Sequence, residues 1–107
     1  MNSKLTIREQ IMVLLKTTDR PLTANDIALI LGLKDVKPKD IYEHLKHVAK
    51  TIKAQSGGKE ALVMIPPSCK SCGYTFTGLD RPKKPSKCPN CKSERITPPA
   101  FKIISVS

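Results

Sequence analysis

The sequence has no tryptophan, only two tyrosines and two phenylalanines, and no apolar run near 18 residues. The scarcity of aromatic residues predicts a core of mainly aliphatic side chains, in one or two small modules. The lack of a long apolar run, and of a recognisable signal peptide, predicts a cytoplasmic protein with no membrane partner.

The sequence also lacks the patterns on which enzymes depend. It has no Ser-His-Asp arrangement, no paired carboxylates in apolar settings, no glycine-rich phosphate loop and no nucleophile elbow. We therefore expect that the protein is not an enzyme.

Cysteine is confined to one stretch, where it forms two Cys-x-x-Cys pairs separated by fifteen residues. This spacing is typical of a tetrahedral metal site, most simply one zinc ion. Four thiolates leave no open coordination position, so the zinc would be structural. The ligands that we predict are Cys69, Cys72, Cys88 and Cys91.

Three alternatives use the same cysteines. Four thiolates also hold iron in rubredoxin, which would make the protein an electron carrier. Two disulfides would require an oxidising compartment, and a thioredoxin-like redox pair would require a βαβ context that the sequence does not show.

Positive charge dominates the sequence, with 19 Lys and Arg against 9 Asp and Glu, a net charge of +10. This excess favours a polyanionic partner such as double-stranded DNA, although a Lys-rich surface that only aids solubility fits it too. Residues 68–98 are especially basic, with seven positive and two negative side chains.

Apolar periodicity predicts three helices, over residues 5–16, 23–31 and 38–53. Capping boxes begin the first two, Gly32 ends the second, and Pro38 begins the third. The apolar stripe expected on the second helix is Ile27, Ile30 and Leu31. The third helix has an aliphatic face of Ile41, Leu45, Val48 and Ile52 opposite a lysine-rich face.

Two apolar runs, residues 61–65 and 101–106, flank the cysteine segment, and each is separated from it by a Pro-Pro pair. If they pair as an antiparallel hairpin, the cysteine segment replaces the hairpin tip. The predicted fold is α+β: a winged helix-turn-helix of three helices plus a β-hairpin, with a zinc ribbon inserted at the wing tip. The predicted domains are residues 1–67 plus 97–107, and the ribbon at 68–96.

A helix-turn-helix places its second helix in the major groove of DNA, and a wing loop contacts phosphate. An ordinary three-helix bundle with a solvated lysine face is the alternative. We predict DNA contacts from the third helix at Lys37, Lys39, Tyr42, Glu43, Lys46, His47 and Lys50. We predict further contacts from the loop between the cysteine pairs at Arg81, Lys83, Lys84 and Lys87.

Three stretches resemble a known family: Asp40 to Lys50, Leu62 to Tyr74, and Lys87 to Ile96. They are similar to the archaeal predicted transcriptional regulators in which a winged helix-turn-helix is fused to a rubredoxin-like zinc ribbon. The resemblance covers almost the whole chain. It implies a zinc-bound winged helix with a role in transcription.

The sequence therefore favours a DNA-binding transcriptional regulator. The alternative is a protein-interaction adaptor in transcription, in which the ribbon contacts the transcription machinery without sequence-specific DNA binding. A homodimer is a further expectation, with residues 5–15 and 103–106 as candidate interface segments.

Overall fold

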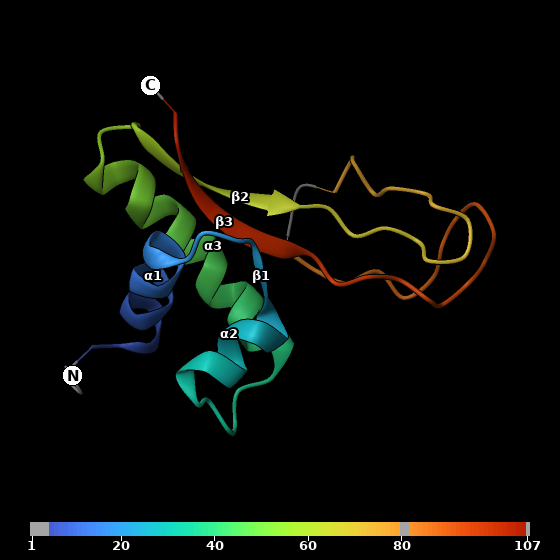
Figure 1. Cartoon of the computed structure of the whole chain (residues 1–107), viewed down its shortest axis with the longest axis horizontal. Helices are drawn as coiled ribbons and strands as arrows, with labels where there is room; N and C mark the ends of the chain where they lie inside the picture. Colours follow the sequence, from blue (N-terminus) through green and yellow to red (C-terminus); the bar gives the residue numbers. More distant parts are fainter. Residues whose placement is uncertain (1–4, 80–81, 107) are drawn as a thin grey trace.

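A computed structural model describes residues 5–79 and 82–106. Within these residues, three helices lie against a small sheet, and the cysteine segment extends away from the sheet as a long projection (Figure 1). The elements in chain order are α1 (Ile7–Thr17), β1 (Leu22–Thr23), α2 (Ala24–Leu31), α3 (Pro38–Gln55), β2 (Glu60–Ile65) and β3 (Ala100–Ser105).

The helix boundaries follow the predicted capping signals. The Thr6 hydroxyl accepts a hydrogen bond from the N–H of Glu9 at 3.1 Å, and the Glu9 carboxylate accepts one from the N–H of Thr6 at 2.9 Å. Thr23 and Asp26 form the same reciprocal pair at the start of α2. Gly32 ends α2 with a φ of 69°, a left-handed conformation that glycine adopts without strain.

The core confirms the predicted apolar face of α3, because all four of its aliphatic positions are buried. The prediction for α2 was wrong at Ile30, which is 52% exposed. The arc that packs inward on this eight-residue helix consists of Ala24, Ile27, Ala28 and Leu31, and it leaves Ile30 on the outside.

The sheet is antiparallel with strand order β1-β3-β2. The predicted pairing of the two apolar runs is confirmed, with a register that runs from Glu60 opposite Ser105 to Ile65 opposite Ala100. The sequence did not indicate β1, because two residues are too few to show an alternating pattern. Leu22 of β1 lies opposite Phe101 of β3, which ties the start of α2 to the sheet.

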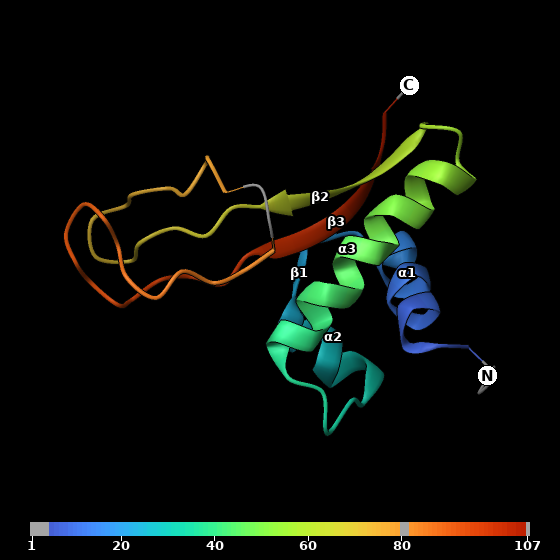
Figure 2. The ribbon, with the colours of Figure 1, turned by 180° about the vertical axis from the view of Figure 1, so that it is seen from behind.

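The cysteine segment leaves and rejoins the body through a fixed junction. Pro67 and Pro99 are fully buried there. The backbone N–H of Ser68 donates to the Thr97 hydroxyl at 2.9 Å, and the N–H of Thr97 donates to the Ser68 carbonyl at 2.8 Å. Both ends of the segment are therefore held by the same hairpin, as both views of the ribbon show (Figures 1 and 2).

Beyond the junction, the described residues between 66 and 99 form only isolated bridges, such as Cys69 opposite Ile96. This segment is called the ribbon below. Among the helices that the structure describes, none combines the length and apolar character needed to cross a lipid bilayer.

Candidate metal centre and the basic surface beside it

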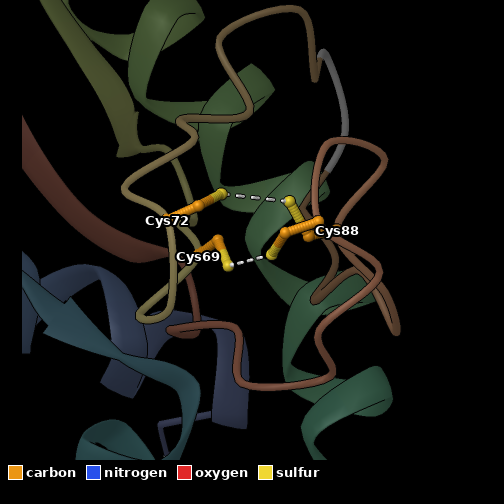
Figure 3. A group of neighbouring side chains, drawn as sticks. Cys69, Cys72 and Cys88 are labelled. Carbon is orange, nitrogen blue, oxygen red and sulfur yellow. Dashed lines mark hydrogen bonds between the residues drawn. The ribbon is translucent and has the colours of Figure 1, made fainter.

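The structure brings the four predicted ligands together. Each cysteine sulfur lies within 4.8 Å of the other three. The Sγ atoms of Cys72 and Cys88 are 3.6 Å apart, and those of Cys69 and Cys91 are 3.5 Å apart. Cys72 and Cys88 face each other across the site from opposite sides of the ribbon (Figure 3).

The two cysteine pairs form the same turn. The N–H of Gly73 donates to the Cys69 carbonyl, and the N–H of Lys92 donates to the Cys88 carbonyl, both at 2.9 Å. Gly73 and Lys92 occupy equivalent positions, directly after the second cysteine of each pair, and both have positive φ, at 81° and 67°. The local chain geometry thus points two sulfurs from each turn toward one centre.

The donor set fits a zinc ion. Zinc–sulfur bonds of about 2.3 Å in a tetrahedron would separate the sulfurs by about 3.8 Å, close to the separations found here. The Asn90 backbone N–H donates to Cys88 Sγ at 3.3 Å, and its side-chain amide donates to Cys72 Sγ at 3.5 Å. Such donors outside the coordination shell stabilise thiolate charge and orient the ligands.

The thiols differ in how readily they ionise. Desolvation raises the pKa of Cys69, but hydrogen bonds from the N–H groups of Cys72 and Ser71 outweigh it and lower that pKa to about 6. At Cys91, the Ser93 N–H lowers the pKa, whereas the hydrogen bond with Cys69 and desolvation raise it to a net value of about 12. A bound divalent cation would stabilise the thiolate of Cys91 and so overcome its raised pKa, since cysteine coordinates metal as the thiolate.

The ribbon has a very small core, formed by Cys69, Cys88 and Ile96 with Phe76 packed against them. Tyr74 is 39% exposed, and its ring packs edge-on against that of Phe76, with 5.0 Å between the ring centroids. So small a core cannot hold the ribbon without metal.

Gly73→Ala is expected to weaken the ribbon by about 1 kcal/mol, since alanine disfavours a left-handed backbone. An added Cβ would meet nothing within 4 Å at Gly73, so the effect would come from the backbone alone. Gly78 has equal space and no positive φ, which makes Gly78→Ala the matched control. Chelator competition for zinc would measure both, and equal losses would contradict the prediction.

The predicted DNA contacts on α3 lie on or near its outer surface. Tyr42 and His47 are half-buried, and both Lys46 and His47 approach the Glu43 carboxylate, at 3.5 and 3.7 Å. The exposed members of the α3 set are Lys37, Lys39, Glu43, Lys46 and Lys50. In the loop, Lys83, Lys84 and Lys87 are exposed, and Arg81 lies outside the described residues.

The structure places part of the loop beside α3. A cavity of about 250 Å³ between them is lined by Lys39, Tyr42, Glu43, Lys46, Pro82 and Lys83. A second cavity, of about 330 Å³, joins Pro82 to Lys46, Lys50 and apolar side chains of α3, β2 and β3. Lys83 of the loop therefore forms one basic surface with Lys39, Lys46 and Lys50 of α3.

Comparison with known proteins gives two family matches. Residues 6–61 match a family model described as PF0610-like, N-terminal. Residues 66–106 match the PF0610 rubredoxin-like zinc beta-ribbon domain. With the four clustered sulfurs, the second match assigns one structural zinc ion to Cys69, Cys72, Cys88 and Cys91.

A solved structure is similar over nearly the full length. It is the solution NMR structure of protein PF0610 from Pyrococcus furiosus, which is 33% identical in sequence. The alignment covers 97% of this chain and 93% of that one, with a TM-score of 0.72. No match is found among curated proteins.

Proposed function

The chain belongs to the PF0610-like family with a rubredoxin-like zinc ribbon, and from this premise we propose that it is a DNA-binding regulator of transcription. We propose further that its fold is a winged helix-turn-helix. The element order and the β1-β3-β2 sheet support this assignment, since a short connection joins α2 to α3 and a hairpin follows α3. The ribbon then takes the place of the wing tip.

One observation carries the functional proposal: α3 is divided into a buried aliphatic face and an outer face rich in lysine, and the ribbon loop adds lysines beside that outer face. Ile41 and Leu45 are fully buried, while Lys39 and Lys50 on the other side are exposed. A helix held by its apolar face that presents ammonium groups outward suits the phosphate backbone that borders a DNA groove.

The proposal includes setting and partners. The protein would act in the reducing cytoplasm, where cysteine thiolates persist as metal ligands. It would act through binding and not as an enzyme, because its metal has a closed shell of four cysteines. A homodimer that uses α1 and the end of β3 would double the number of base contacts available to one monomer.

Lys50→Ala is expected to weaken the salt dependence of DNA binding. The slope of log K against log salt should become less steep by about one, because one phosphate contact is lost. Lys59→Ala, in the turn between α3 and β2, removes the same charge at the end of the domain away from the ribbon (Figure 1). Fluorescence anisotropy with a labelled duplex would measure both slopes.

The Lys59→Ala slope should stay at the wild-type value. A wild-type protein that binds no duplex even at low salt would overturn the functional proposal. Selection from a random DNA library by the zinc-loaded protein would then supply the preferred sequence, and a palindrome would support the dimer.

The second candidate is the protein-interaction adaptor, here with α2 in place of the ribbon as the surface that contacts the partner. It is favoured by the apolar residues that α2 presents to solvent, with Leu29 73% and Ile30 52% exposed. Pro82 and Lys83 of the loop also lie beside the outer face of α3, where they would restrict how deeply that helix could enter a DNA groove. The test is binding of a purified component of the transcription machinery to two double variants. Binding to Lys46→Ala/Lys50→Ala, with no binding to Leu29→Ser/Ile30→Ser, would favour the adaptor over the DNA-binding function.

A further inference from the structure

A third cavity lies where the ribbon meets the first turns of α2 and α3. Its volume is about 480 Å³, within the usual size range of small-molecule sites. Figures 1 and 2 show that the chain between the two cysteine pairs returns from the ribbon to the base of β2 and β3. The cavity is lined by Ala24, Asn25, Pro38, Lys39, Tyr42, Lys83, Lys84 and Pro98.

The lining of the cavity is positively charged. Lys39, Lys83 and Lys84 contribute three ammonium groups, and no lining residue is acidic. Within residues 5–79 and 82–106, none of these three lysines forms an ion pair with a carboxylate.

The acidic residues next to Asn25 and Lys39 in the sequence are already engaged. The Asp26 and Asp40 carboxylates each accept a backbone N–H at the start of their own helix, at 3.1 Å. Three ammonium groups from two separate chain segments thus share one cavity, and no carboxylate among the described residues pairs with them.

The remaining lining residues can hydrogen-bond to a ligand and contact its apolar parts. Asn25 has a side-chain amide that both donates and accepts hydrogen bonds. Burial raises the pKa of Tyr42, so its hydroxyl stays protonated and able to donate. One alanine and two prolines form apolar walls: Ala24 and Pro38 from the helix starts, and Pro98 from the end of the ribbon.

We propose that this cavity binds a phosphate-bearing ligand whose phosphoryl oxygens accept hydrogen bonds from Lys39, Lys83 and Lys84. Lysine binds phosphate as a point charge, and three lysines match an anion with more than one negative charge. The ligand would bridge α3 and the ribbon loop, so its binding would hold the loop against the helix.

Two sources offer this phosphoryl chemistry. A free nucleotide would make the cavity an effector site that needs no DNA binding. A phosphodiester of duplex DNA would make it part of the DNA interface, and in that case the inference rests on the proposed function. The cavity residues and the contacts are the same for both sources, so one set of variants tests the site.

The test is titration of the zinc-loaded full chain with adenosine 3′,5′-bisphosphate at low ionic strength. Calorimetry measures the affinity, and backbone NMR locates the residues that respond. Saturable binding is expected, with shift changes at the amides of residues 24–25, 39 and 83–84. Lys39→Gln/Lys84→Gln should weaken binding by about tenfold or more, because two charge-assisted contacts are lost.

Lys53→Gln/Lys59→Gln is the matched control, since it removes the same charge from exposed lysines that do not line the cavity. Its affinity for the bisphosphate should stay within about twofold of wild type. Equal weakening in both double variants would show attraction by net charge only and would overturn the site. Shift changes confined to other segments, or no binding, would overturn it as well.

A duplex arm separates this inference from the proposed function. If a duplex binds and displaces the bisphosphate, the phosphoryl source is DNA. If the bisphosphate binds and no duplex does, the cavity stands as a site for a free ligand while the DNA-binding proposal fails. If a duplex binds with equal affinity to wild type and to Lys39→Gln/Lys84→Gln, and the bisphosphate does not bind, the site fails alone.

Discussion

Cys88→Ser is expected to abolish stoichiometric zinc binding and to unfold the ribbon, while the three helices keep their structure. Cys88 is fully buried at the centre of the ribbon core, and its sulfur lies 3.6 Å from that of Cys72. Serine offers a hydroxyl that is a far weaker zinc ligand than a thiolate. Structural zinc contributes about 10 kcal/mol or more to the folding of comparably small modules, so no other contact in the ribbon can compensate.

Metal analysis and two-dimensional NMR would measure the effect. Amide signals of the described ribbon residues should collapse toward random-coil positions, and those of α1, α2 and α3 should remain dispersed. Ser71→Ala is the control, since it removes only the 2.9 Å hydrogen bond between the Ser71 and Ser93 hydroxyls. Full zinc content in the variant would contradict the prediction, and loss of the helices together with the ribbon would contradict the predicted division into two domains.

Zinc has a consequence beyond the ribbon itself. The basic loop begins after the first cysteine pair and ends at Cys88, so the metal fixes both of its ends. Lys83 lines two cavities whose opposite wall is α3. Release of zinc would free the loop and disperse the basic surface. Metal content therefore has to be controlled in every binding measurement on this protein.

Local patterns in the sequence were sufficient for much of the fold. The helices were predictable because capping boxes and apolar periodicity act within a few residues, as at Thr6 and Thr23. The metal ligands were predictable because the chelating turn is itself a local structure, and the structure places all four cysteine sulfurs within 4.8 Å of one another.

Features that depend on distant segments were not predictable. β1 forms only because β3 offers a partner for Leu22 and Thr23. The exposure of Ile30 depends on which side of α2 the rest of the domain covers. The approach of Lys83 to α3 depends on the path of the ribbon loop in space, and no spacing in the sequence encodes that path. Asn25 was missed in the candidate site for the same reason.

Phe101→Ala is expected to destabilise the helical domain by about 3–5 kcal/mol, the usual cost of deleting a buried phenyl ring and leaving a cavity. Phe101 is 1% exposed and lies in β3 between Leu22 of β1 and Met64 of β2. Its ring centroid is 6.1 Å from that of Tyr42 on α3. The side chain thus joins all three strands to the helix that we propose enters DNA.

Chemical denaturation followed by circular dichroism would measure the loss, which is large against a typical total of about 5–15 kcal/mol. Val106→Ala, five residues further along the same chain segment and 42% exposed, should change stability by less than about 0.5 kcal/mol. A small effect at Phe101 would mean that the sheet and α3 do not share one core. Because the zinc ligands lie outside this core, the variant should still bind one zinc ion, and loss of zinc as well would show that the hairpin must be folded for the ribbon to form.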